Sequence, residues 1–451
     1  MRTMTSVRTW VRRAAVAGVT AAALTGVLPS ATADLSLPLI PTTTATKPAP
    51  ALPTNFLWGV ASAGFQVEGH TPDSNWSRYV ATKSTDDPIG NADDFYDRYT
   101  SDIALAQQMG VKVYRISIEW ARLEPQPGRY DPAAWAFYDR VVAAIRAAGM
   151  RPMLTIDHWV YPGWEASLGG WSRAGMVDDW LANAKLVVDR YKTYDPLWVT
   201  INEPVFYAAQ EVTNGGLSPT GLTTMLDRLV TVHNTIYDYI HTVQPGAMVT
   251  SNVAYISGAE SLADVLFLNR TASHMDFLGI DYYYPVSATD PISSLNALLN
   301  QPYNASLAPE GIYYALRHYA QAYPGQPLYI VENGMPTQDA AARPDGWTRV
   351  NDLQDTVYWL QRARAAGINV IGYNYWSLTD NYEWGSYTPR FGLYTVNAKT
   401  DPTLQRIPTA AVPAYTGDIA RGGVPSGYQL SRPTQFCSLV DLLSSCLDPV
   451  S

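Results

Sequence analysis

The chain has 451 residues, a length that suits either two domains of ordinary size or one large α/β barrel. It is 47% hydrophobic and 16% charged, a composition typical of a globular protein with a sizeable core. The net charge is −9, and no sustained basic run follows the N-terminal segment, which argues against nucleic acids and anionic membranes as partners. The 30 Tyr and 14 Trp against 9 Phe favour aromatic rings that carry a polar group, which suit sugar ligands, although most of them are expected in the core.

The N-terminal segment, residues 1–33, has the pattern of a secretory signal peptide. Four arginines come first, and the apolar stretch AAVAGVTAAALTGVL and a small-residue site follow them. We expect cleavage after Ala33 and a secreted protein. The apolar stretch is short for a membrane span, so a membrane anchor is the less favoured alternative and no stable membrane association is expected.

Residues 34–53 are rich in Pro, Thr and Ala and predict an extended linker. From residue 54 onward, short apolar runs alternate with longer amphipathic segments. The runs predict eight strands, at 56–63, 113–120, 151–159, 197–204, 248–255, 276–284, 327–334 and 368–377. Helices are predicted between them, among others at 133–148, 176–191, 221–242, 261–273 and 352–366. Eight such pairs predict an α/β fold, a (β/α)8 TIM barrel that forms a single domain over residues 54–427.

A short C-terminal tail, residues 428–451, is expected to be loosely attached, because the chain there is rich in Pro, Gly and Ser. It contains the two cysteines of the chain, Cys437 and Cys446. In an exported protein these two could close a small disulfide loop. Two cysteines are too few for a metal site built on thiolates.

Two predicted strands end on a carboxylate. In LWVTINEPV the apolar run leads to Asn202 and Glu203, and in LYIVENGMP it leads to Glu332. A charged group in such a place is costly unless it is paired, hydrogen-bonded or functional. In a TIM barrel the carboxyl ends of the strands surround one pocket, so Glu203 and Glu332 are expected to face each other across its mouth.

Two carboxyl groups among Trp, Tyr, His and Asn, without a nearby cysteine or a cluster of metal ligands, favour cleavage of a glycosidic bond. That reaction needs one carboxyl group protonated, to assist the leaving oxygen, and one ionised, to attack or stabilise the anomeric carbon. No metal and no other cofactor is expected. The expected partner is a small glycoside or oligosaccharide, and no pattern in the sequence indicates an oligomeric state.

The chain resembles family 1 glycoside hydrolases, the group of β-glucosidases and β-galactosidases, from about residue 52 to residue 396. The resemblance rests on seven motifs in order: FLWGVASAGFQVEG, YRISIEWARLEP, HW, NEP, DYYYP, VENG and WSLTDNYEW. It implies that Glu332 is the catalytic nucleophile and Glu203 the general acid/base of a retaining β-glycosidase. In such enzymes the two carboxyl groups lie roughly 5 to 5.5 Å apart.

The resemblance also implies a set of substrate-binding residues. These are Gln66, His158, Asn202, Tyr283, Trp376, Glu383, Trp384 and Phe391. By the same resemblance Arg115 holds the nucleophile electrostatically. Asp281 departs from the family pattern, which usually has Asn there, and we expect its carboxylate to add negative charge beside Glu332 and to raise its proton affinity or disturb its hydrogen bonds.

Other functions remain open from the sequence. A transglycosidase would use the same two carboxyl groups with a sugar in place of water as acceptor. A non-hydrolytic carbohydrate-binding barrel is a further alternative, since a fold does not fix a function, although a binding protein needs neither Glu203 nor Glu332. A 6-phospho-β-glycosidase is less favoured, because Glu383 would repel the phosphate.

Overall fold

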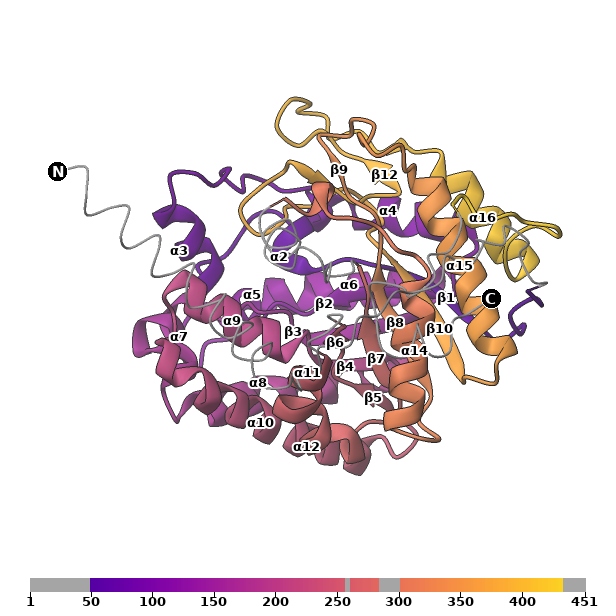
Figure 1. The fold of residues 1–451 in the computed structure, drawn as a ribbon. Helices are drawn as coiled ribbons and strands as arrows, with labels where there is room; N and C mark the ends of the chain where they lie inside the picture. Colours follow the sequence, from indigo (N-terminus) through magenta and orange to yellow (C-terminus); the bar gives the residue numbers. More distant parts are fainter. Residues whose placement is uncertain (1–48, 256–259, 284–300, 433–451) are drawn as a thin grey trace, which may run out of the picture.

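The computed structural model describes residues 49–255, 260–283 and 301–432. The predicted signal peptide, most of the predicted linker, and both cysteines lie outside these residues. The described chain forms one parallel sheet of nine strands in the order β5-β4-β3-β2-β1-β10-β8-β7-β6, with helices outside it (Figure 1). The strands are β1 Leu57–Ala61, β2 Val113–Ser117, β3 Arg151–Asp157, β4 Leu197–Ile201, β5 Met248–Thr250, β6 Val253–Ala254, β7 Leu278–Asp281, β8 Leu328–Asn333 and β10 Val370–Trp376.

The sheet closes into a barrel because β5 and β6 are the two halves of one interrupted strand. Ser251 and Asn252 separate them, β5 pairs with β4, and β6 pairs with β7. The Ser251 hydroxyl donates to the carbonyl of Ile201 at 2.7 Å, so a side chain takes over the link to β4 where the regular ladder stops. Counted this way the barrel has the eight strands that the sequence predicted, and the (β/α)8 fold is confirmed.

The outer helices follow the strands in sequence. The long ones are α4 Phe95–Met109, α6 Pro132–Ala147, α8 Met176–Tyr191, α10 Leu222–Val243, α14 Gly311–Ala322, α15 Arg349–Ala365 and α16 Ala411–Arg421. Side-chain caps fix the starts of two of them. Asp131 accepts a hydrogen bond from the Ala133 amide at 2.8 Å, with Pro132 at the first position of α6, and Thr348 accepts one from the Asn351 amide at the start of α15. The helix predicted at 261–273 is instead a series of short helical segments, from Glu260–Ala263 to Ala272–His274.

Two predicted strands end three residues earlier than the sequence suggested, because helices begin inside the predicted ranges. Helix α5 (Trp120–Leu123) follows β2, and helix α9 (Pro204–Asn214) starts with proline at its first position, which favours a helix start. Asn202 and Glu203 therefore lie in the turn between β4 and α9. They are in the tight connection at the carboxyl end of the barrel and not in the strand itself.

The core has an inner and an outer part. Inside the barrel a small cluster of fully buried side chains fills the space between the strands: Val113, Met153, Leu197, Val199, Phe277, Tyr329 and Val331. A larger cluster lies between the strands and the helices. Within the described residues, no helix combines the length and the apolar character needed to cross a bilayer.

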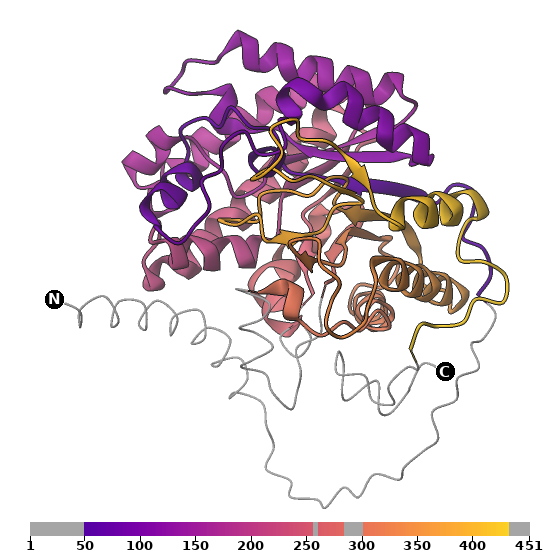
Figure 2. The same ribbon diagram turned by 90° about the horizontal axis from the view of Figure 1, so that it is seen from above.

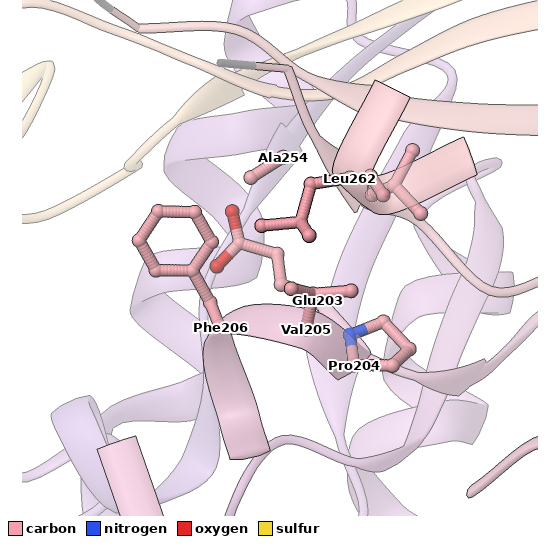
Figure 3. Close-up of a pocket in the computed structure, with 8 residues that line it drawn as sticks. Glu203, Pro204, Val205, Phe206, Ala254 and Leu262 are labelled. Atoms are coloured by element: carbon pink, nitrogen blue, oxygen red, sulfur yellow. The ribbon is translucent and has the colours of Figure 1, made fainter. Parts of the chain in front are cut away.

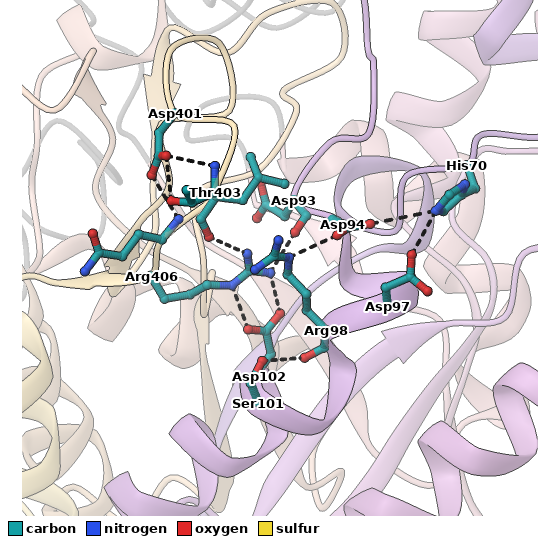
Figure 4. Close-up of polar contacts among 12 residues, drawn as sticks. His70, Asp93, Asp94, Asp97, Arg98, Ser101, Asp102, Asp401, Thr403 and Arg406 are labelled. Carbon is teal, nitrogen blue, oxygen red and sulfur yellow. Dashed lines mark hydrogen bonds and ion pairs between the residues drawn. The ribbon is translucent and has the colours of Figure 1, made fainter.

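The two ends of the described chain meet on one side of the barrel (Figure 2). The Leu52 amide donates to the carbonyl of Gly422 at 2.7 Å, and the Gln361 side chain donates to the carbonyls of Ala49 and Pro50. Farther along, the Arg406 guanidinium donates to both carboxylate oxygens of Asp102 on α4, each at 2.8 Å (Figure 4).

The first residues of the predicted tail are also attached to the barrel. The Tyr428 hydroxyl donates to Asp355 Oδ1 at 2.6 Å, and the guanidinium of Arg432 lies 4.5 Å from the ring centre of Trp347. These contacts join residues 428–432 to the barrel, and the rest of the predicted tail lies outside the described residues.

Candidate active site

Glu332 lies near the end of β8 and is held on both carboxylate oxygens. Arg115, fully buried on β2, makes a close ion pair with Oε1, and the Tyr283 hydroxyl donates to Oε2 at 2.8 Å. The residue is 5% exposed. A cation on one oxygen and a hydroxyl donor on the other fix the position of this buried carboxylate through charge-assisted hydrogen bonds.

The turn after Glu332 is fixed by its neighbours. Asn333 Nδ2 donates to the carbonyl of Tyr282 at 2.6 Å, and the Tyr373 hydroxyl donates to Asn333 Oδ1 at 2.9 Å. A Cβ on Gly334 would lie 1.9 Å from the carbonyl oxygen of Trp376, so only glycine permits this approach to the end of β10. The sequence Glu-Asn-Gly thus sets the position of the carboxylate.

Glu203 occupies the residue before helix α9, with φ of 41° in the left-handed region, where few residues other than glycine are found. Its amide donates to the carbonyl of Asn252 at 3.0 Å. Burial, and then the negative charge of Glu332, raise the pKa of Glu203 to about 8, and Arg115 opposes the shift. Glu203 is therefore a protonated acid at neutral pH while Glu332 stands beside a cation.

Arg115 also links Glu332 to Asn202. Its guanidinium donates to Asn202 Oδ1 at 2.7 Å, in addition to Glu332, and Nε donates to Thr155 Oγ1 at 2.9 Å. Asn252 donates to the same Asn202 oxygen at 2.7 Å. Two donors on Oδ1 fix the orientation of the Asn202 amide and turn its NH2 group away from Arg115, in the sense needed to meet a sugar hydroxyl.

Buried polar groups without hydrogen-bond partners line one part of the site. Gln66 is fully buried beside Glu383, yet neither amide atom makes a hydrogen bond of good geometry among the described residues. His158 Nδ1 is likewise unpaired in the described part of the chain, and burial together with Arg115 lowers the pKa of His158 far below its usual value. A neutral imidazole and an unsatisfied amide are groups that a polyhydroxylated ligand would satisfy.

Glu383 completes this polar wall. Its Oε1 accepts hydrogen bonds from Asn381 Nδ2 at 2.8 Å and from Trp376 Nε1 at 3.2 Å. Burial raises the pKa of Glu383 to about 7, against the hydrogen bonds from Asn381 and Trp376.

Aromatic rings surround the polar groups. The rings of Trp376 and Trp384 lie parallel to that of His158, each with centroids 5.9 Å apart, and Trp384 also stacks on Trp159 at 4.8 Å. Phe391 is 5% exposed and contacts Tyr283 edge to face at 5.8 Å. Trp376 and Trp384 thus lie against His158, and Phe391 lies against the tyrosine that hydrogen-bonds to Glu332.

A small, partly open apolar pocket lies beside Glu203. It is lined by Glu203, Pro204, Val205, Phe206, Val253, Ala254, Leu262 and Ala263. Figure 3 shows the Glu203 carboxyl group reaching between the ring of Phe206 and Ala254. The acid thus has a polar neighbourhood toward Glu332 and an apolar one on this other side.

The structure brings together all twelve residues that the sequence singled out, and it adds Asn252, which the sequence analysis missed. Asn252 interrupts an apolar strand and contacts both Asn202 and Asp281. An amide inside the run MVTSNVAY was the available signal, because a buried amide must find partners. A second missed group supports the wall beside Trp159: Glu211 accepts hydrogen bonds from Asn75, Tyr79 and Tyr161.

One group of metal-ligand type occurs within the described ranges, and it lies on the surface away from this site. His70, Asp94 and Asp97 bring one ligand atom each within 4.8 Å of one another (Figure 4). Asp94 is already paired with Arg98 at 3.0 Å, and His70 is exposed. These contacts are those of a surface ion-pair group.

Taken together, a carboxylate beside an arginine, a second carboxyl group held protonated, and a wall of amide, imidazole and indole groups at the mouth of a (β/α)8 barrel define a glycosidase. The family model for glycosyl hydrolase family 1 matches residues 49–256 and 264–421. The chain belongs to glycosyl hydrolase family 1.

Individual relatives agree with this assignment. The 1,4-beta-D-glucan glucohydrolase of Thermotoga neapolitana is 26% identical over 421 residues, covering 77% of this chain and 98% of the relative. The galactolipid galactosyltransferase SFR2 of Arabidopsis thaliana is 27% identical over 350 residues, covering 68% of this chain and 55% of the relative. Among solved structures, the Thermotoga maritima β-glucosidase in complex with azafagomine has a TM-score of 0.72 at 23% identity and covers 83% of this chain and 100% of that one.

Proposed function

We propose that the protein is a retaining β-glycosidase that hydrolyses β-glucosides or related β-glycosides. The observation that carries the proposal is the unequal pair of carboxyl groups at one barrel mouth, Glu332 beside Arg115 and Glu203 with a pKa of about 8. Two carboxyl groups with different proton affinities are what acid-assisted nucleophilic displacement at an anomeric carbon requires.

In the first step Glu332 attacks the anomeric carbon and Glu203 gives its proton to the leaving oxygen. Arg115 and Tyr283 each hold one oxygen of the Glu332 carboxylate and so fix its position. The glycosyl group becomes bonded to Glu332, and the aglycone departs as the alcohol. Asn202, fixed through its Oδ1, is placed to donate to the sugar as charge develops.

In the second step Glu203 is a carboxylate and acts as the base. It takes a proton from water, the water oxygen attacks the anomeric carbon, and the bond to Glu332 breaks with its electrons returning to the carboxylate. Two inversions give net retention of configuration. Activity should fall above about pH 8, because Glu203 then loses the proton that the first step needs.

The leaving-group side of the site favours an apolar aglycone. Apart from Glu203, every residue that lines the pocket beside it is apolar, and Phe206 and Leu262 provide its largest side chains. An aryl or alkyl group gains by leaving water there, whereas the hydroxyls of a second sugar would find no partner on these side chains.

Transglycosylation by the same pair of carboxyl groups is the second candidate. A relative named as a galactosyltransferase matches this chain, and the apolar residues beside Glu203 would face an acceptor alcohol as well as a leaving group. The two activities differ only in which hydroxyl group Glu203 deprotonates in the second step.

The test is a panel of aryl, alkyl and glycosyl β-glycosides with chromatographic analysis of the products. We expect release of nitrophenol from aryl β-glucosides, and kcat/KM about tenfold or more higher for aryl than for glycosyl aglycones of the same glycone, since apolar burial differs by roughly 1.5 kcal/mol or more. Phe206→Ser should reduce the preference, with Leu186→Ser, an exposed residue of α8, as the matched control. No release from any β-glycoside would refute the function, and sugar transfer as the main product would favour the second candidate.

We also propose export, supported by the N-terminal sequence pattern. The basic start, the apolar run and the small residues before Asp34 are together typical of a cleaved signal. Protein recovered from the culture medium of a secreting host should begin near Asp34 on N-terminal sequencing. A membrane-bound product that still begins at Met1 would contradict the proposal.

A further inference from the structure

A third carboxyl group lies between the two that the mechanism uses. Asp281 is the last residue of β7, is 1% exposed, and stands opposite Glu332 in the register of β7 and β8. Its carboxyl group is in hydrogen-bonding contact with that of Glu203. Two carboxyl groups can hydrogen-bond to each other only if one of them carries a proton.

The other contacts of Asp281 leave room for a proton. Asn252 Nδ2 makes a close hydrogen bond to Oδ2, and no N–H or hydroxyl donor reaches Oδ1 among the described residues. Asn252 donates from the same nitrogen to Asn202 Oδ1, so the amide presents donors to both neighbours. Oδ2 is thus the acceptor of the Asp281 carboxyl group, and Oδ1 is the atom available to be a donor.

The charges that face this position do not compensate a third carboxylate. They come from β8 (Glu332), from the turn after β4 (Glu203) and from β2 (Arg115), and Glu383 in the loop after β10 adds a negative charge that acts on Glu203. Arg115 is the one cation among these described groups, and it already pairs with Glu332. Burial, followed by the charges of Glu332 and Glu203, raises the pKa of Asp281 well above its usual value.

We propose that Asp281 is a positioning residue for the acid/base: it is protonated in the resting enzyme and donates its hydrogen bond to the carboxyl group of Glu203. The inference rests on the proposed function, in which Glu203 transfers the proton. When Glu203 gives its proton to the leaving oxygen, the new carboxylate keeps the hydrogen bond from Asp281. When Glu203 then takes a proton from water, the same bond remains, and Asp281 itself exchanges no proton in the cycle.

Position 281 then carries a neutral hydrogen-bond donor and not the negative charge that was expected from the sequence. A neutral carboxylic acid has one donor and one acceptor at the same places as a carboxamide. Asp281→Asn is therefore the conservative variant: its oxygen accepts from Asn252 and its nitrogen donates to Glu203. Asp281→Ala removes the donor without adding a charge.

The pH dependence of kcat/KM on an aryl β-glycoside separates the two charge states of Asp281. If Asp281 is protonated, Asp281→Asn leaves the fall in activity near pH 8 in place and keeps kcat within about threefold. Asp281→Ala takes away a hydrogen bond that lowers the pKa of Glu203. In this variant the fall in activity therefore moves to higher pH, and kcat drops about tenfold or more. If Asp281 were ionised, both variants would remove a negative charge and move the fall to lower pH, which would overturn the proposal.

Infrared difference spectra test the proton directly and need no turnover. Wild type minus Asp281→Asn at pH 7 should show the C=O band of a protonated carboxyl group, and a carboxylate band in its place would refute the inference even if Asp281→Ala fails to fold. Circular dichroism establishes that the Asn variant is folded. Failure of the proposed function would appear separately, as wild-type protein that releases no aglycone from any β-glycoside.

Discussion

Replacing Glu332 with Gly should abolish hydrolysis, lowering kcat by on the order of 10⁴-fold or more, equivalent to about 5 kcal/mol of barrier. The glycosyl group then has no carboxylate to bond to, and the Arg115 cation loses its partner. Azide added to the variant can enter the space left by the Glu332 side chain, on the face of the sugar opposite the leaving group. It should restore turnover of an aryl β-glycoside and yield a glycosyl azide of inverted configuration, identified by proton NMR.

The control for Glu332→Gly is a variant of another buried carboxyl group that the mechanism does not use. Glu211 is 1% exposed and binds Asn75, Tyr79 and Tyr161 away from the reacting atoms. Glu211→Gln should lower activity far less and should show no response to azide. Activity of Glu332→Gly close to that of wild type, or an azide product of retained configuration, would contradict the assignment of the nucleophile.

Replacing Glu203 with Ala should have an effect that depends on the leaving group. General acid catalysis contributes roughly 10²–10⁴-fold, so kcat/KM for an alkyl β-glycoside should fall by about that factor. For a dinitrophenyl glycoside, which leaves without protonation, the first step should persist, and the glycosyl-enzyme should accumulate as a burst of phenolate. Stopped-flow absorbance measures the burst, and mass spectrometry of quenched protein locates the sugar on Glu332.

Azide should accelerate the second step of Glu203→Ala and give a product of retained configuration, because it attacks from the face that Glu203 occupied. The basic limb of the pH profile should also disappear, since the group with a pKa of about 8 is absent. Equal losses for good and poor leaving groups would show that Glu203 is not the acid. The two glutamates are thus distinguished by the stereochemistry of rescue and not only by loss of activity.

The barrel was predictable from the sequence because its strands are short apolar runs of regular spacing. The strand at 327–334 is one case: Leu328 to Val331 are apolar and wholly buried, and the Asn-Gly turn follows. The positions of Glu203 and Glu332 followed from the same reasoning, since each ends such a run. The family resemblance supplied the assignment of roles, which no spacing in the sequence contains.

Details that depend on contacts between distant segments were not predictable. The polar pair Ser251 and Asn252 signals an irregularity in the fifth strand but not its partners, which are the carbonyl of Ile201 and the side-chain oxygen of Asn202. The charge state of Asp281 depends in the same way on Glu203 and Asn252. The amino-acid sequence alone does not show which polar groups contact one another inside the barrel.

The hydrogen bond between Leu52 and Gly422 has a consequence for how the barrel is assembled. Strand β1 pairs with β10, from Leu57 beside Gly372 to Ala61 beside Trp376. The barrel is therefore closed by segments far apart in the sequence, and the contact between Gln361 and Ala49 likewise joins positions 312 residues apart. Such distant pairing makes closure a slow event in folding. The segments around Leu52 and Gly422 are neighbours in space. A circular permutant that joins these two segments by a short peptide, and that opens an exposed loop elsewhere, should therefore retain the barrel. In that variant the last strands to pair in folding should be those next to the new termini.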